Sequence, residues 1–252
     1  MDHFKIVKNS EEITFHAYMN RLNEIARDCG GEIYFAEIFM PFLRMCSPDD
    51  AKIIPIFDDR LPGPKTKDEN KRDTRERMNI ICALNEDESY SVPDYIYVST
   101  DYTFKNPQKP YLMVETKEPI FLKEQTYYRD LKDYIDKYKK QLKAQINSCG
   151  CVIFTDGITW MFLVDNGEDG IKEHPNYKTI QLLNMQSEKY YSTYKSTRKF
   201  SERQIDLSFI APCLSNIIIK DAPQEWNILK ARIKKLVNQQ IQKDNHKLNN
   251  ND

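Results

Sequence analysis

Two short stretches of the chain place charged side chains within otherwise apolar sequence. In residues 92–98, Asp94 follows a proline and opens an apolar run, and in residues 111–117, Glu115 precedes Lys117 by two positions. Alternate side chains of a β-strand share a face, so Glu115 and Lys117 would project side by side. The strand that follows Asp94 could pair with theirs as a hairpin. Two carboxylates and an ammonium group at one sheet edge suit a hard divalent cation and the anionic transition state of phosphodiester cleavage.

Each of these residues also has an ordinary structural explanation. Proline–aspartate pairs are common in turns. Glu115 and Lys117 could simply lie on the solvated face of an edge strand. An acid is nevertheless unfavourable among the apolar residues of a central strand. The downstream segments favour the functional interpretation.

These downstream segments add a helix and a second pair of strands. A long helical segment over residues 125–148 carries Gln141 followed by a leucine. Residues 151–163 are predicted to form two strands around a Thr-Asp-Gly turn, with Trp160 in the second strand. Together with the Pro-Asp and Glu-x-Lys motifs, this order resembles the PD-(D/E)xK nuclease superfamily. Within it, the chain is most similar to the N-terminal nuclease domain of type I restriction motor subunits and their stand-alone relatives. The resemblance covers roughly residues 32–163.

The resemblance implies a fold and a metal site. The expected fold is α/β, a restriction-endonuclease-like central mixed sheet flanked by helices, with a C-terminal helical extension. Asp94 and Glu115 would hold one or two Mg²⁺ (or Mn²⁺) ions, helped by the backbone carbonyl of Thr116. Many relatives add a glutamate from an early helix, for which Glu37 is the better candidate and Glu32 the second.

The resemblance also assigns roles to the lysine and to the long helix. Lys117 would orient the attacking water and offset charge on the phosphate, and Gln141 would position Lys117 or the phosphate. Gln145 stands where the family has a tyrosine, so only Gln141 carries over. Both glutamines interrupt an aromatic and aliphatic helix stripe, and either could simply hydrogen-bond the backbone. Three lysines on the other faces fit a solvated surface, or could guide a nucleic-acid backbone toward the site: Lys137, Lys140 and Lys143.

The N-terminal part of the chain is predicted to supply two helices and a loop. Apolar residues at helical spacing indicate helices over residues 11–29 and 32–45. Proline, glycine and charged residues indicate a loop insertion over about residues 47–70. A short helix is then expected over residues 71–84. The nuclease-like domain is predicted to span residues 11–205.

The C-terminal part, residues 206–252, is predicted to be a helical extension with a disordered tail from residue 242. Before it, residues 166–178 are expected to form a polar connector and residues 180–185 a strand. The extension has a stripe at helical spacing: Trp226, Leu229, Ile233, Val237 and Ile241. Such a stripe must pack on the core, on a second copy of the chain or on a protein partner. Because cleavage of two strands is most simply achieved by two sites, a homodimer is expected.

Composition excludes several other classes of function. The net charge of −1 over 252 residues lacks the basic excess of a general nucleic-acid binder, so a DNA-facing surface must be local. The four histidines form no HExxH motif, and the seven glycines form no phosphate-binding loop. The six cysteines form no CxxC pair. No signal region or membrane span is evident, so a cytoplasmic protein is expected.

The sequence therefore predicts a metal-dependent nucleic-acid phosphodiesterase, most simply a DNA endonuclease in restriction, phage defence or a mobile element. One alternative is a catalytically silent nucleic-acid-binding or docking module of a larger assembly. Another is a nuclease effector gated by a ligand or partner. Retention of Asp94, Glu115 and Lys117 together favours the enzyme.

Overall fold

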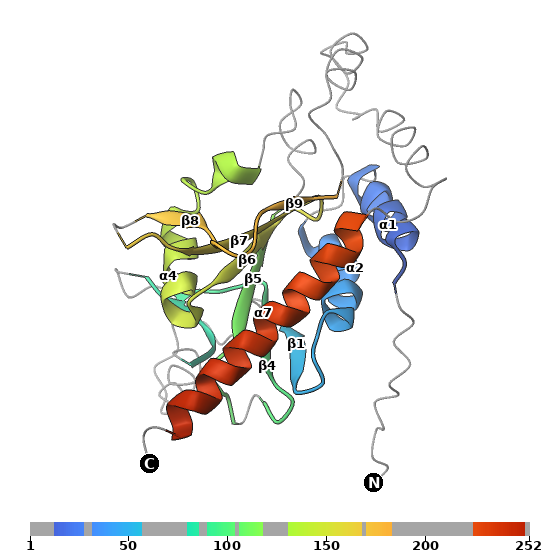
Figure 1. Cartoon of the computed structure of the whole chain (residues 1–252). Helices are drawn as coiled ribbons and strands as arrows, with labels where there is room; N and C mark the ends of the chain where they lie inside the picture. Colours follow the sequence, from blue (N-terminus) through green and yellow to red (C-terminus); the bar gives the residue numbers. More distant parts are fainter. Residues whose placement is uncertain are drawn as a thin grey trace, which may run out of the picture.

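The computed structural model of the chain describes residues 13–27, 32–56, 80–85, 90–103, 106–117, 131–167, 170–182 and 224–249. Within them the chain is an α/β protein with a mixed, open seven-stranded sheet and a C-terminal helix (Figure 1). The helices are α1 (Phe15–Arg27), α2 (Glu32–Met45), the 3-10 helix η3 (Leu131–Tyr134), α4 (Lys139–Cys149) and α7 (Gln224–Asn249). The strands of the sheet are β1 (Ala51–Pro55), β4 (Tyr95–Ser99), β5 (Leu112–Thr116), β6 (Val152–Thr155), β7 (Thr159–Asp165), β8 (Ile171–Glu173) and β9 (Ile180–Gln181). A separate two-stranded sheet joins β2 (Ala83–Leu84) to β3 (Tyr90–Ser91).

The strand order explains why Glu115 cannot lie on an edge strand. The sheet runs β1-β4-β5-β6-β7-β8, with β9 also paired to β7. The expected hairpin is confirmed, because β4 pairs antiparallel to β5 with Tyr95 opposite Val114. On its other side β5 pairs parallel to β6, and such pairs need a crossover connection, which here contains α4. The edge-strand explanation of Glu115 is therefore wrong.

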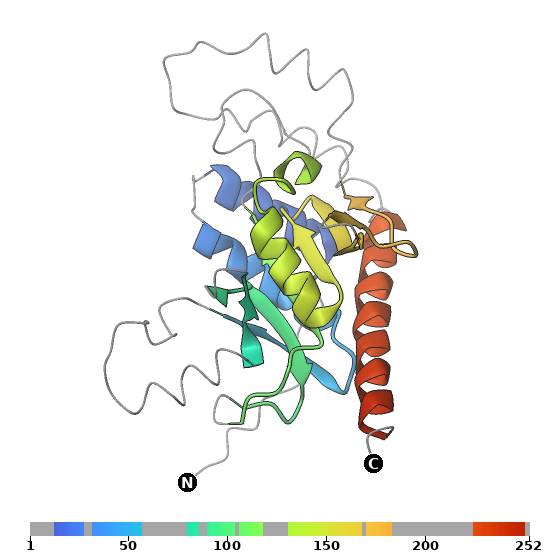
Figure 2. The ribbon, with the colours of Figure 1, turned by 90° about the vertical axis from the view of Figure 1, so that its left-hand side faces the viewer.

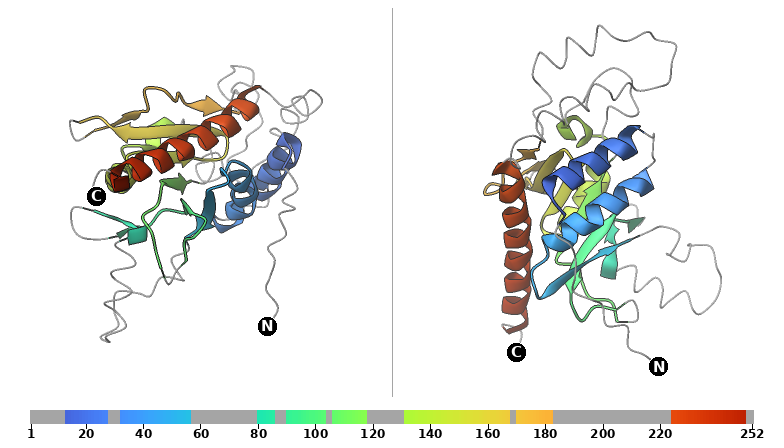
Figure 3. Two further views of the ribbon diagram at one scale, coloured as in Figure 1. Left: turned by 60° about the horizontal axis from the view of Figure 1, so that its bottom comes forward. Right: turned by 90° about the vertical axis from the view of Figure 1, so that its right-hand side faces the viewer.

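The sheet is covered on both faces, and β5 contributes to both cores. Leu112 and Val114 pack into a core shared with α1, α2 and α7, whereas Met113 packs into a second core beneath α4. Seen from opposite sides, α4 lies over the sheet in Figure 2, and α1 and α2 lie over it in the right-hand view of Figure 3. The alternation predicted for this strand is confirmed. It places Glu115 on the α4 side.

Helix α7 belongs to the core of its own chain. The ring of Trp226 lies 5.5 Å from that of Phe15, 5.1 Å from that of Tyr18 and 4.6 Å from that of Phe42, measured between centroids. The stripe that suggested a second copy is thus buried against this chain's own helices. It therefore does not support the expected homodimer. The helix also continues to Asn249, so the expected disorder from residue 242 is wrong for residues 242–249.

Two segments expected to be irregular contain strands. β1 lies inside the predicted loop insertion over residues 47–70 and pairs along its whole length with β4. β8 lies inside the predicted polar connector over residues 166–178 and pairs with β7. Both are short, so neighbouring proline, glycine and charged residues dominated the pattern. Residues 57–70 lie outside the described part of the chain.

Two predicted helices are shorter than expected. In the segment over residues 71–84, residues 80–81 are helical as predicted, the last two residues form β2, and residues 71–79 lie outside the described part. In the described part of the segment expected to be a long helix over residues 125–148, η3 and a turn precede regular α-helix, which starts at Lys139. Residues 125–130 and 183–185 are likewise outside the described part. Among the described helices, none has the length and apolar character needed to cross a membrane.

Candidate active site

Glu115 is a buried acid on a buried central strand. All five residues of β5 are buried, and the side chain of Glu115 is among the least accessible, since the residue is 1% exposed. The strand forms here because its apolar and β-branched residues, Leu112, Val114 and Thr116, fit a pleated surface packed on both sides. The local sequence thus carries the carboxylate into the interior.

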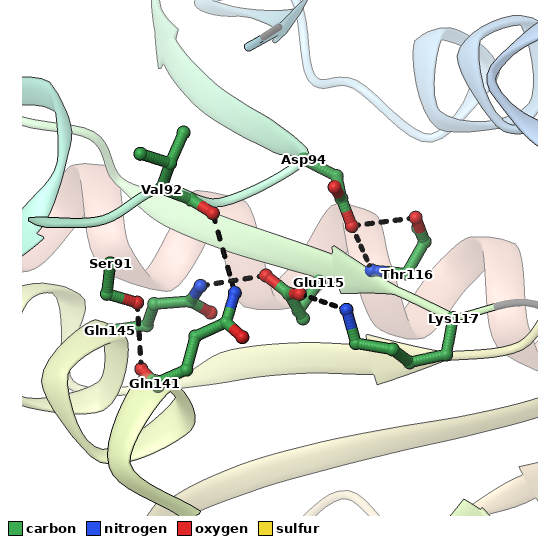
Figure 4. A network of polar contacts seen from close by, with 8 residues as sticks. All are labelled: Ser91, Val92, Asp94, Glu115, Thr116, Lys117, Gln141 and Gln145. Carbon is green, nitrogen blue, oxygen red and sulfur yellow. Dashed lines mark hydrogen bonds and ion pairs between the residues drawn. The ribbon is translucent and has the colours of Figure 1, made fainter. Parts of the chain in front are cut away.

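Both oxygens of the Glu115 carboxylate are bound by side chains (Figure 4). Lys117 forms an ion pair with Oε1, as expected from their shared face. Gln145 of α4 donates from Nε2 to Oε2 at 2.9 Å. Glu115, Lys117 and Gln145 are therefore joined directly, with the acid in the middle.

Asp94 lies beside this group and is held by the next residue of β5. One of its oxygens, Oδ2, accepts hydrogen bonds from the backbone N–H of Thr116 at 2.6 Å and from its hydroxyl at 2.7 Å. The pairing of Tyr95 with Val114 continues by one position to place Asp94 opposite Glu115. The structure thus brings the two acids to the same end of the hairpin, with the Asp94 carboxylate turned toward Thr116 (Figure 4).

The environment of Glu115 favours its neutral form. Burial, and then the negative charge of Asp94, raise the pKa of Glu115 to about 8, against the opposing effects of Lys117 and Gln145. A buried carboxyl that already has a cation beside it and still resists ionisation lacks sufficient positive charge nearby. Such a site gains from an additional cation.

The amide that reaches Glu115 belongs to Gln145, which was not among the predicted site residues. Gln141 lies one helical turn earlier, and its Nε2 donates to the carbonyl of Val92 at a long 3.5 Å. Its own backbone carbonyl accepts from the hydroxyl of Ser91 at 3.1 Å. The available signal was the spacing of four between the glutamines, which places both on one helix face. The predicted role of Gln141 toward Lys117 or phosphate stays a prediction.

The Thr-Asp-Gly turn after β6 is a structural element. Asp156 Oδ1 accepts from the backbone N–H of Ile158 at 2.9 Å and of Thr159 at 2.7 Å, which closes the turn. The hydroxyl of Tyr18 in α1 donates to the carbonyl of Gly157 at 2.9 Å. Trp160, fully buried, completes this corner. The turn fixes β6, whose Thr155 carbonyl accepts the backbone N–H of Lys117 at 2.8 Å.

The other predicted site residues are placed to different extents. Glu32 and Glu37 belong to α2, and their side chains lie outside the described part of the chain. Lys137 and Lys140 are exposed, and Lys143 is half-buried. Their predicted contact with nucleic acid is untested.

The residues present fit a hard divalent cation, although the acids number only two. No group of three or more His, Cys, Asp or Glu side chains forms a metal site within the described residues. Asp94 and Glu115 supply carboxylate oxygens, which Mg²⁺ and Mn²⁺ prefer. Gln145 is fully buried, and within the described part of the chain its Oε1 has no hydrogen-bond partner. An unsatisfied buried oxygen beside a destabilised carboxylate suits a hydrated cation.

Comparison with protein-family models, with curated proteins and with solved structures gives no match for this chain. The resemblance to nucleases therefore depends on the motifs and on the geometry described above.

Proposed function

We propose that this chain is a metal-dependent nuclease of the restriction-endonuclease-like type that hydrolyses phosphodiester bonds in DNA. The observation that carries the proposal is the buried Glu115, paired with Lys117 and flanked by Asp94 on the central hairpin. These residue types, in this order on adjacent strands, are those of the nuclease family that the sequence resembles.

A purely structural role explains Glu115 poorly. Burying a carboxylate costs several kcal/mol even after pairing, and an apolar residue of similar size is often as stable or more so. The strand already has apolar partners on both faces, which an apolar residue at this position would extend. Strongly perturbed acids of this kind concentrate at functional sites.

In this proposal, the side chains of the site have separate roles in hydrolysis. Asp94 and Glu115 would bind Mg²⁺ or Mn²⁺, together with the Thr116 carbonyl. When bound, such an ion polarises the phosphate and lowers the pKa of water. Lys117 would orient the attacking water and offset the charge that builds on the phosphate. The water oxygen bonds to phosphorus, the bond from phosphorus to the leaving sugar oxygen breaks, and a proton of the water ends on that oxygen.

Gln145 supports this arrangement from α4. Its Nε2 holds one oxygen of Glu115, which fixes the direction in which the other lone pairs point. Groups that orient metal-binding carboxylates in this way usually affect metal affinity or activity by 10- to 100-fold.

The test is cleavage of plasmid DNA, single-stranded DNA and RNA in Mg²⁺, in Mn²⁺ and in EDTA. Cleavage should require the metal, and Glu115→Gln, Asp94→Asn and Lys117→Ala should each reduce it by roughly a hundredfold or more. Three variants of exposed residues serve as matched controls: Glu225→Gln, Asp101→Asn and Lys172→Ala.

Two outcomes would contradict the proposal. Metal-dependent cleavage that survives Glu115→Gln in a well-folded variant would mean that another acid carries the chemistry. Binding of DNA without cleavage in any metal would instead support a silent nucleic-acid-binding module.

A further inference from the structure

A pair of tyrosines and a lysine lie next to the proposed active site, in the segment between η3 and α4. The rings of Tyr134 and Tyr138 are nearly parallel, with 14° between their planes and 6.2 Å between their centroids. The ammonium group of Lys137 lies 5.4 Å from the centroid of Tyr134 and 5.5 Å from that of Tyr138. We call these three residues the tyrosine platform.

The platform is continuous with Lys117. The ammonium group of Lys117, which pairs with Glu115, lies 4.6 Å from the centroid of the Tyr138 ring. A run of direct contacts therefore leads from Glu115 through Lys117 and Tyr138 to Tyr134. A nucleic-acid strand with a phosphate at Lys117 would bring its next nucleotide close to these rings.

The tyrosine platform is fixed to the core on one side and partly exposed to solvent on the other. Leu131 is fully buried, and the Tyr138 ring packs against Phe154 at 6.2 Å, so the segment is fixed on the core under α4. Both tyrosines remain half-buried and Lys137 is exposed. Figure 2 shows the short helix η3 beyond the end of α4, away from the body of the sheet.

Covering the core does not by itself explain this composition. Leucine or methionine would cover the core edge equally well, without drawing two cations onto the ring faces. Within the described part of the chain, Lys137 has no acidic partner. Its exposed ammonium group can therefore contact a phosphate, and the half-buried ring of Tyr134 keeps part of its surface accessible.

We propose that the tyrosine platform binds an unpaired nucleotide beside the scissile phosphate, so that the substrate is DNA with a single-stranded segment at the site. This inference rests on the proposed nuclease function. Tyr134 stacks with the base and Lys137 contacts its phosphate. Aromatic stacking selects unpaired bases because both faces of a base inside a duplex are already covered by its neighbours.

The test is binding of a short single-stranded DNA and of a blunt duplex of the same sequence, both in EDTA so that no cleavage occurs. Tyr134→Leu should weaken binding of the single strand by roughly tenfold and leave duplex binding unchanged, since one stacked base is lost. Tyr134→Phe keeps the aromatic face and should bind as the parent does. A 2-aminopurine base in the single strand should be quenched by the parent and by Tyr134→Phe, but not by Tyr134→Leu.

A second variant guards against misfolding. Lys137 is exposed, so Lys137→Ala should fold normally and weaken single-strand binding with a shallower salt dependence. Lys172→Ala, at an exposed lysine on β8, is its matched control. Thermal unfolding of each variant verifies that the fold is intact.

The outcomes separate the platform from the nuclease. Equal weakening of single-strand and duplex binding by Tyr134→Leu, or no weakening, would overturn the platform. A platform that quenches single-stranded RNA but not DNA would overturn its assignment to DNA. Selective binding of single-stranded DNA without metal-dependent cleavage would support the platform and reject the nuclease. Metal-dependent cleavage that is confined to duplex DNA and unchanged by Tyr134→Leu would support the nuclease and reject the platform.

Discussion

Replacing Glu115 by glutamine is expected to stabilise the folded chain increasingly as the pH rises. Glutamine has nearly the same size and removes only the ionisable group. Burial and Asp94 raise the pKa of Glu115 from 4.5 to about 8 in the folded chain. Between these values the folded chain holds one more proton than the unfolded chain does. Its free energy of unfolding therefore falls as the pH rises above about 4.5, and levels off above about 8.

The size of the effect follows from the width of this interval. Each pH unit costs about 1.4 kcal/mol, so the whole interval corresponds to at most about 5 kcal/mol. Glu115→Gln has no carboxyl group at this position, so its unfolding free energy does not fall in this way. The difference in unfolding free energy between variant and parent should thus grow by several kcal/mol from pH 5 to pH 9. Loss of the contact with Lys117 adds an offset, so the slope with pH is the diagnostic quantity.

Urea unfolding followed by tryptophan fluorescence suits this measurement. Trp160 and Trp226 are the two tryptophans of the chain and both are buried in the same core. The series is run in EDTA at several values of pH, with Glu225→Gln as an exposed control. Parallel curves for parent and Glu115→Gln would refute the reasoning, because they would mean that Glu115 ionises equally easily in both states. Added Mg²⁺ should recover stability at high pH in the parent alone.

Three further predictions concern other parts of the molecule. Gln145→Leu should reduce metal-dependent cleavage about tenfold or more and weaken Mg²⁺ binding by calorimetry, whereas Gln141→Leu should leave Mg²⁺ binding nearly unchanged. Gly157→Ala should cost more unfolding free energy than Gly150→Ala. Both glycines have positive φ, but only at Gly157 would a Cβ meet side chains at 3.1 Å. Trp226→Ala should cost about 3–5 kcal/mol in urea unfolding and leave the sedimenting mass unchanged, because this ring packs on its own chain.

The sequence predicted the hairpin and its alternation because both depend on a period of two. Residues 111–117 read as one strand without a turn residue, so the shared face of Glu115 and Lys117 followed from their spacing of two. The stripe of α7 was equally regular. β1 was missed because a five-residue strand gives a weak signal beside a stretch rich in proline and charge. Its pairing with β4 and the burial of Ala51 and Ile53 in the core stabilise it, and pairing between distant segments leaves no local pattern.

The choice between the two glutamines could not be made from the sequence. A spacing of four places Gln141 and Gln145 on one face of α4, but one helical turn apart, so they lie over different parts of β5. Which amide meets Glu115 depends on where α4 starts relative to β5. The helix was expected to begin near residue 125, whereas within the described residues from 131 on regular helix begins at Lys139. Helix position along a sheet is set by packing beneath it, here by Leu142 and Ile146, and no motif records it.

The ion pair between Lys117 and Glu115 and the role proposed for Lys117 toward phosphate exclude each other, and this constrains how the proposed site would work. In the structure its charge offsets that of Glu115. If Lys117 turned toward a phosphate while nothing else balanced Glu115, a buried carboxylate would be left unpaired, at a cost of several kcal/mol. The lysine is therefore available to a substrate only when Glu115 is neutralised, either by a proton or by another cation. Where the pH is high enough to ionise Glu115, the arrangement couples release of Lys117 to occupation of the acidic site by a cation. At such a pH, a nuclease built in this way would hold its lysine back from phosphate until the metal is present.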